Sequence, residues 1–335
     1  MSSEQIKAKP RVGFLGVGWI GRHRMAAALA TGLIEAAAVA DPSSEMVDEA
    51  LRLAPNAQPV SSLEDMLALD LDAIVIATPS ALHAQQAIEA LDAGAAVFCQ
   101  KPLGRTAEEV RDVVAAARKA DRLLGVDFSY RFTEGMRHVR GLITRGELGQ
   151  VFAADLVFHN AYGPDKAWFY DPAQSGGGCM TDLGIHLVDL ALWTLGSAEV
   201  QDVSGRLFAA GEPLASLENQ VEDFGTAVLT LKNGASVRIA CSWKLHAGQD
   251  AVISASFYGT KAGAALRNIG GSFYDFVAER FDGTQTTTLA TPPDEWGGRA
   301  IADWARRLAG GNRFSADAEE FVTVSEVLDR IYSRA

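Results

Sequence analysis

The sequence predicts two domains: a doubly wound, parallel α/β sheet, followed by an α+β domain with a large, open, mainly antiparallel sheet. Up to about residue 127, short apolar runs alternate with helical patterns, which is the rhythm of a parallel sheet. Later segments show period-two alternation instead, and no long helix separates most of them. The chain has 335 residues, too many for one compact core. We place the domains at residues 1–127 and 128–335.

The first half carries the elements of the parallel sheet. Its predicted strands are RVGFLG, LIEAAAVAD, LDAIVIATP and AAVFCQKPL. Its predicted helices are WIGRHRMAAALATG, ALHAQQAIEALDAG and TAEEVRDVVAAARKA. The run LDAIVIATP is too apolar to be half exposed, so it belongs in the middle of the sheet. The last helix begins with Thr106 and Glu109 in the spacing of a capping box.

A glycine motif, GVGWIG, leaves the first strand and opens the first helix. Its glycines allow close backbone approach to a pyrophosphate, and the helix N-terminus supplies positive partial charge. Asp41 ends the second strand, where a dinucleotide fingerprint has its acid. That acid would bind the adenine ribose and repel a 2′-phosphate, which favours NAD over NADP. In the alternative interpretation the glycines only pack tightly and Asp41 only ends a strand. The predicted cofactor contacts here are Gly16, Gly18, Trp19, Ile20, Gly21 and Asp41.

Further cofactor contacts are predicted at the carboxyl ends of the strands, where a ligand would cross the sheet. Thr78 and Pro79 end one strand, and His83 lies one turn into the next helix. Lys101 ends a later strand at the same edge, and Arg131 lies at the domain junction. The alternatives are a packing role for His83, a solvated edge position for Lys101 and an interface brace for Arg131.

The second half predicts the antiparallel sheet. Its predicted strands are VFAADLVFHNA, EVQDVSGRLFA, EDFGTAVLTL, ASVRIACSW, AVISASFYGT and SFYDFVAERF. Asn233-Gly234 is a hairpin signal between two of them. Residues 133–149 predict a short helix, and residues 300–309 and 321–332 predict helices able to pack back on the first domain. An uncovered sheet face favours a homo-oligomer, a dimer or tetramer.

One predicted helix, within GGGCMTDLGIHLVDLALW, is apolar over most of its circumference. Asp182, His186, Asp189 and Trp193 nevertheless share a narrow stripe on it. Burying such groups without partners costs roughly 2–7 kcal/mol each, even when they are neutral. We interpret the stripe as the wall of a substrate pocket, with Asp189 holding His186 or a loop amide. The alternative is that Asp182 caps the helix while His186 and Asp189 satisfy each other in the core.

Composition argues against nucleic-acid and membrane partners. The formal net charge is −12 and no lysine- or arginine-rich run occurs. No apolar stretch reaches the roughly 18 residues of a membrane helix, and the first residues lack the apolar core of a signal peptide. Cys99, Cys179 and Cys241 are far apart in sequence, without metal-binding spacing. We expect a cytoplasmic protein with free thiols and no bound metal.

Four segments together resemble the glucose–fructose oxidoreductase/inositol dehydrogenase (Gfo/Idh/MocA) family, over essentially the whole chain. They are GVGWIG, TPSALHAQQAIEALDAGAAVFCQKPL, GGGCMTDLGIHLVDLALWTLG and DAEEFVTVSEVLDRIYSRA. The resemblance implies an N-terminal Rossmann domain and a C-terminal open sheet that commonly mediates oligomerisation. It also implies oxidation or reduction of sugars and polyols with a nicotinamide cofactor.

The resemblance also implies the catalytic groups. Lys101 matches the lysine of the family's Glu-Lys-Pro motif, and Asp182 and His186 match its Asp-x-x-x-His pair. Hydride transfer is the cofactor's chemistry, so the protein must bind, orient and move one proton. A histidine suits that proton in both directions, and Lys101 can stabilise a developing alkoxide. We favour His186 as the proton carrier; the reversed assignment stays open. Asp182, one turn before His186, would orient the imidazole or bind a sugar hydroxyl.

The surroundings of Lys101 carry further implications of the resemblance. His83 is expected near the cofactor, and the peptide bond between Lys101 and Pro102 is expected to be cis. One position departs from the family pattern, because Gln100 stands where the motif has glutamate. A neutral amide cannot hold the lysine by charge, which puts the position and protonation state of Lys101 in question.

The segment HNAYGPDKAWFYDP is rich in aromatic faces and mixed donors, as sugar-binding loops are. It offers Tyr162, Asp165, Lys166 and Trp168 as substrate contacts beside Lys101, Asp182 and His186. The alternative is an ordinary loop pinned by its aromatic residues.

We therefore predict an NAD-dependent dehydrogenase of a sugar, inositol or related polyol. Three alternatives remain: an enzyme that cleaves glycosides through transient sugar oxidation, a non-catalytic NAD-binding sensor, and an NADPH-dependent reductase.

Overall fold

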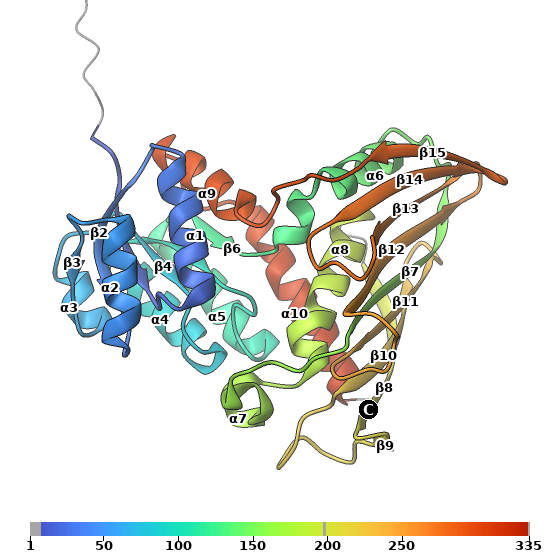
Figure 1. Ribbon diagram of the computed structural model, residues 1–335, viewed down its shortest axis with the longest axis horizontal. Helices are drawn as coiled ribbons and strands as arrows, with labels where there is room; N and C mark the ends of the chain where they lie inside the picture. The colour runs from blue at the N-terminus through green and yellow to red at the C-terminus, as the bar shows by residue number, and fades with distance from the viewer. Residues whose placement is uncertain (1–7, 197–198, 334–335) are drawn as a thin grey trace, which may run out of the picture.

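The computed structural model describes residues 8–196 and 199–333. Two separate sheets organise the chain, and Figure 1 shows the small one at one end of the molecule and the large one at the other. Helices α6, α8 and α10 lie between them, on the inner face of the large sheet. They span Glu134–Thr144, Ile185–Thr194 and Glu319–Ser333. The predicted fold class is confirmed.

The N-terminal sheet has six parallel strands in the order β3-β2-β1-β4-β5-β6. The strands are β1 Arg11–Leu15, β2 Glu35–Ala40, β3 Gln58–Pro59, β4 Ala73–Ile76, β5 Ala96–Cys99 and β6 Leu124–Val126. The helices are α1 Trp19–Ala30, α2 Ser44–Leu53, α3 Leu63–Leu67, α4 Ser80–Asp92 and α5 Ala107–Ala120. Every residue of β4 and β5 is buried, as their unbroken apolar runs predict for central strands.

The C-terminal sheet has nine strands in the order β15-β14-β13-β12-β7-β11-β10-β8-β9. All its pairs are antiparallel except β7 with β11. The strands are β7 Val151–Asn160, β8 Val200–Ala209, β9 Glu212–Pro213, β10 Phe224–Leu231, β11 Ser236–Ser242, β12 Ala251–Gly259, β13 Gly263–Asn268, β14 Phe276–Asp282 and β15 Gln285–Ala290. Asn233-Gly234 joins β10 to β11, and Gly234 has the positive φ of 86° that such a hairpin turn needs.

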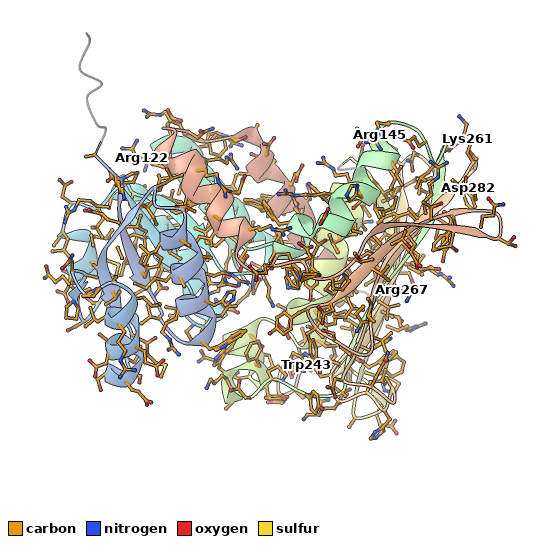
Figure 2. All side chains as sticks on the ribbon, turned by 45° about the horizontal axis from the view of Figure 1, so that its top comes forward. Arg122, Arg145, Trp243, Lys261, Arg267 and Asp282 are labelled. Atoms are coloured by element: carbon orange, nitrogen blue, oxygen red, sulfur yellow. The ribbon has the colours of Figure 1, made fainter. Side chains whose placement is uncertain are left out.

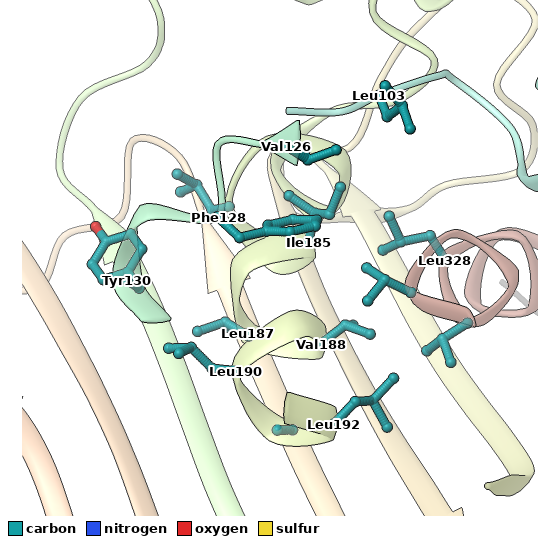
Figure 3. Packing of buried hydrophobic residues seen from close by; sticks show 14 of the residues in the cluster. Leu103, Val126, Phe128, Tyr130, Ile185, Leu187, Val188, Leu190, Leu192 and Leu328 are labelled. Carbon is teal, nitrogen blue, oxygen red and sulfur yellow. The ribbon is translucent and has the colours of Figure 1, made fainter. Parts of the chain in front are cut away.

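Helix α8 is buried on every side. Its leucines, isoleucine and valine point in several directions, toward the sheet, toward α10 and toward the first domain (Figure 3). A helix that is hydrophobic all round belongs in a core. The sequence predicted one continuous helix after the glycine run, but a π-helical turn, Met180–Gly184, precedes α8.

The remaining short helices connect these elements. They are η1 Ser129–Phe132, η2 Ala167–Tyr170, α7 Pro172–Ser175, α9 Arg299–Ala309 and η4 Ala316–Ala318. Helix α9 packs on α1, β5 and β6, and α10 packs on α5, so both C-terminal helices contact the N-terminal elements. In the described part of the chain no helix is long and apolar enough to cross a membrane. The three cysteines are buried free thiols.

Candidate active site

An ion pair joins the two halves of the chain. Lys101 follows the carboxyl end of β5, and its Nζ donates to Asp182 Oδ1 at 2.6 Å and to the Asp182 carbonyl at 2.8 Å. Both side chains are mostly buried, with 18% and 16% of their surfaces exposed. Asp182 lies in the π-helical turn before α8. The structure thus brings two of the predicted catalytic residues into contact, and the peptide bond after Lys101 is cis, as expected.

Trp243, directly after β11, supplies a second donor to the same carboxylate. Its indole Nε1 donates to Asp182 Oδ2 at 3.1 Å, and the side chain is buried. Figure 2 labels Trp243 on the side of the large sheet that faces the rest of the molecule. Sequence reasoning missed this residue, because nothing in ASVRIACSW distinguishes it from an ordinary core tryptophan. The carboxylate of Asp182 thus has one oxygen on Lys101 and the other on Trp243, and among the described residues no hydrogen bond joins it to His186.

His186 lies beside this ion pair on α8. Its ring packs edge-on against Tyr130, at 5.0 Å between centroids, and against Phe128 at 6.5 Å. Burial lowers the pKa of His186 well below 6.5, and the positive charges of Lys101 and Arg24 lower it further. Within residues 8–196 and 199–333, no group hydrogen-bonds its ring nitrogens. His186 is therefore a buried, neutral imidazole at pH 7.

Tyr130 is a site residue that the sequence did not predict. It lies in η1, its ring is buried, and it packs in a tilted arrangement against Trp296, at 4.8 Å between centroids. Burial raises the pKa of its hydroxyl, and the nearby charge of Asp182 raises it further. Tyr130 is thus a neutral phenol next to both Asp182 and His186.

Asp189, one turn further along α8, has a different partner from the one considered above. Arg131 binds its carboxylate through Nε and Nη2, at 2.5–3.0 Å, and binds Glu320 of α10 through Nη1 at 2.8 Å. Burial raises the pKa of Asp189 to about 6, and the guanidinium of Arg131 opposes that shift. His186 and Asp189 therefore do not satisfy each other. Arg131 ties η1 to α8 and α10, as expected of a brace.

A buried carboxylate shapes the glycine run before Asp182. Glu222 is fully buried and accepts hydrogen bonds from the backbone N–H groups of Gly178, at 3.0 Å, and Met180, at 2.8 Å. It also accepts one from the hydroxyl of Tyr332, at 2.8 Å. A Cβ on Gly178 would collide with the carbonyl of Glu222. Glycine is required here because the backbone approaches so closely.

The glycine motif has the geometry of a tight strand-to-helix turn. Gly16 has φ of 83°, and a Cβ there would lie 2.5 Å from the carbonyl oxygen of Ala77. Asp41 Oδ2 accepts from the backbone N–H of Val17 at 2.9 Å, so the predicted ribose-binding acid also holds this turn. Trp19 is 66% exposed at the start of α1.

His83 links the other two strand ends. Its Nε2 lies 2.7 Å from the carbonyl of Thr78, after β4, and its Nδ1 lies 2.7 Å from the carbonyl of Pro102. The ring is buried, and burial lowers its pKa. Pro79 precedes the first turn of α4. His83 thus fixes the loop that carries Lys101.

The aromatic loop 161–171 lies against Trp243. The rings of Phe169 and Tyr170 contact Trp243 at 6.3 and 5.6 Å, and Trp168 stacks on Phe169 at 3.8 Å. Tyr162 is more exposed and donates to Asp250 at 2.6 Å. Asp165 and Lys166 pair with each other at the surface. Of the predicted substrate contacts in this loop, Trp168 is therefore tied through Phe169 to the ring beside Asp182.

No group of three His, Cys, Asp or Glu side chains in the described residues is arranged to hold a metal ion. The arrangement can bind a polar substrate oxygen between an ammonium group and a neutral imidazole, next to aromatic faces.

Two family models match the chain. Residues 10–128 match "Oxidoreductase family, NAD-binding Rossmann fold", and residues 136–265 match "GFO/IDH/MocA C-terminal domain". D-glucoside 3-dehydrogenase of Escherichia coli K12 is 28% identical over 100% of this chain and 98% of its own. A putative UDP-kanosamine synthase oxidoreductase subunit of Amycolatopsis mediterranei is 30% identical over 97% and 96%.

Solved structures share the fold. Levoglucosan dehydrogenase, in complex with NADH and levoglucosan, superposes with a TM-score of 0.83 at 22% identity, over 98% of this chain and 97% of that one. KijD10, a 3-ketoreductase in complex with NADP, gives 0.83 at 21% identity, over 97% and 98%. With a parallel nucleotide-binding sheet, an open antiparallel sheet and family matches in both halves, this chain belongs to the Gfo/Idh/MocA family of oxidoreductases.

Proposed function

We propose that the protein is an NAD-dependent dehydrogenase that moves a hydride between a hydroxyl-bearing carbon of a sugar, inositol or related polyol and the nicotinamide. The observation that carries this proposal is the meeting of Lys101 and Asp182 at 2.6 Å beside a buried, neutral His186. The relatives named as sugar dehydrogenases support the substrate class.

The residues of the N-terminal sheet fit a dinucleotide. Gly16 and Gly21 keep the turn tight, because a Cβ on them would collide with the carbonyls of Ala77 and Gly16. Gly18 has open space at its Cβ position, so the backbone there would approach the pyrophosphate. Asp41 would bind the adenine ribose and disfavour a 2′-phosphate, which supports NAD over NADP. When bound, the nicotinamide supplies or accepts the hydride.

The chain's own residues handle the proton. In the oxidative direction, His186 accepts the hydroxyl proton of the substrate as the carbon–oxygen double bond forms. Lys101, held by Asp182, donates a hydrogen bond to that oxygen and stabilises its developing negative charge. In the reverse direction His186 returns the proton. The low pKa of His186 supports this assignment over the reversed one, since a neutral imidazole is ready to act as a base.

The test is a panel of sugars, inositols and glycosides assayed for NADH formation. We expect turnover on at least one of them. His186→Ala should abolish turnover while leaving the dissociation constant of NADH unchanged. Near-wild-type turnover of that variant would sink the assigned role. Glycoside cleavage without net NADH formation would favour the alternative mechanism of transient sugar oxidation.

We also infer self-association through the outer face of the large sheet. Phe152 on β7, Val228 on β10 and Tyr258 on β12 expose 53%, 42% and 40% of their surfaces. Phe152 and Tyr258 lie on neighbouring strands, and β11 separates them from Val228. Exposed apolar side chains on one sheet favour a covering partner. Light scattering should give a mass at least twice that of the chain, and a monomer would contradict the inference.

A further inference from the structure

A buried polar cluster lies directly beside Lys101. The carboxylate of Asp127, just after β6, accepts the side-chain amide of Gln100 at 2.6 Å and Nε of Arg24 at 2.5 Å. Asp127 is 1% exposed, Arg24 7% and Gln100 8%. Both donors converge on Oδ2, whereas Oδ1 is buried with no hydrogen-bond partner among the described residues. The cluster therefore depends on one oxygen that accepts two short hydrogen bonds.

The charges of this cluster constrain residue 100. One cation, one anion and one neutral amide give no net charge in a buried site. A glutamate at position 100, as in the family motif, would face Asp127 at hydrogen-bond distance, and of the described cations Arg24 is the one that contacts Asp127. Two carboxylates so close cannot both ionise. The identity of residue 100 is therefore coupled to that of residue 127.

The cluster also joins the parts that must be aligned for hydride transfer. Gln100 immediately precedes Lys101, so the bond from Gln100 to Asp127 fixes the chain from which the ammonium group projects. Arg24 lies in α1, the helix that follows the glycine motif. Asp127 thus connects the helix at the cofactor site to the strand end that carries Lys101. Arg24 is also close enough to His186 to lower its pKa.

We propose that Asp127 is a positioning residue for the reaction and carries, from the neighbouring strand, the anionic charge that the family motif places at position 100. It holds the strand end before Lys101 and helix α1 in a fixed relation through Gln100 and Arg24. This inference rests on the proposed dehydrogenase function.

A charge-exchange cycle tests it with three variants: Asp127→Asn, Gln100→Glu and the two combined. Asp127→Asn leaves Arg24 without its anion, and Gln100→Glu adds a second one. Each single change should lower kcat about 10–100-fold, because small displacements of catalytic groups cost that much. KM for the substrate should change less than about threefold, since neither residue touches substrate. The combined variant restores one cation, one anion and one amide, so its kcat should recover most of the loss.

Asp92→Asn is the matched control, because Asp92 is an exposed acid of the same domain whose partner, Lys119, is also at the surface. Its kcat should equal that of the wild type. A combined variant no better than the worse single variant, or wild-type kcat in Asp127→Asn, would overturn the proposal. If Asp127→Asn does not fold, folding of the combined variant is itself the expected rescue, and its failure counts against coupling.

The same cycle gives a readout independent of the substrate. Thermal unfolding and NADH titration of the four proteins should show the rescue even if no sugar or polyol is turned over. Rescue in stability and NADH affinity without any activity would reject the proposed dehydrogenase function but keep the coupling. If the enzyme is active and the effects of the two substitutions add, the coupling is rejected and the proposed dehydrogenase function stands.

Discussion

Replacing Tyr332 by phenylalanine should destabilise the π-helical turn Met180–Gly184, which carries Asp182. Tyr332 lies at the end of α10, and its hydroxyl is 2.8 Å from both Glu222 Oε1 and Thr181 Oγ1. Thr181 immediately precedes Asp182, while Glu222 holds the glycine run. The substitution removes these two hydrogen bonds, together with a longer one from the backbone N–H of Thr181 at 3.2 Å, and leaves the aromatic ring in place.

The magnitude follows chiefly from the two shorter of the three lost hydrogen bonds. A hydrogen bond to a charged group contributes about 1.5–3 kcal/mol, and a neutral one about 0.5–1.5 kcal/mol. The backbone donors to Glu222 remain, so we expect the free energy of unfolding to fall by about 2–4 kcal/mol. Burial raises the pKa of Glu222, whereas the hydroxyl of Tyr332 lowers it, so its removal raises this pKa further. The loss is therefore largest where the carboxylate is charged and shrinks at acidic pH.

The assay is urea denaturation at neutral and acidic pH, with kcat/KM measured in parallel. Tyr162→Phe is the control for stability, because Tyr162 also donates to a carboxylate, that of Asp250, but is 56% exposed. It should change stability by less than about 0.5 kcal/mol. Equal effects of the two substitutions would refute the role given to the buried hydroxyl. A loss of unfolding free energy in Tyr332→Phe that grows as the pH falls would also refute it.

Three further outcomes follow from the site. Because burial holds the pKa of His186 below 6.5, kcat/KM for oxidation should stay constant from neutral pH to below 6.5. The free energy of unfolding should fall below pH 6.5, because the unfolded chain binds the proton of His186 more readily. A fall of kcat/KM that begins above pH 6.5 would contradict the lowered pKa. Trp243→Phe removes a donor to Asp182 and should lower kcat/KM about tenfold; unchanged steady-state kinetics would leave Trp243 a packing residue only. Asp41→Ser should narrow the preference for NADH over NADPH in fluorescence titrations, and an unchanged ratio of dissociation constants would refute its role.

The sequence predicted the elements whose patterns are local and strong. Strands β4 and β5 are unbroken apolar runs, and the hairpin at Asn233-Gly234 has its own turn signal. Strands β13 and β15 were not predicted. The segment GAALRN is short and begins with small residues, and QTTTLA is almost entirely exposed. Both strands pair with β14, one on each side of it, so they are defined by their neighbour in the sheet and not by a local pattern.

The residues of the site also fall into those that a local motif predicts and those that it does not. Lys101, Asp182 and His186 were predicted from motifs, and the structure brings them together. Trp243, Tyr130 and Glu222 were not, because their roles depend on contacts between segments far apart in sequence. The π-helical turn could not be predicted either, since Glu222 and not the local sequence holds its first N–H group, that of Met180, and the N–H group of Gly178 before it. The pairing of Asp189 with Arg131 likewise arises from an element 58 residues away.

The three glycines at 176–178 limit how the enzyme's specificity can be redesigned. A side chain on Gly176 would meet Arg105, one on Gly177 would meet Tyr332, and one on Gly178 would meet Glu222. Each neighbour comes from a different part of the chain, so no single compensating change makes room for all three. Mutant libraries aimed at new substrates should leave this run intact and vary the aromatic loop 161–171, whose exposed tip tolerates change.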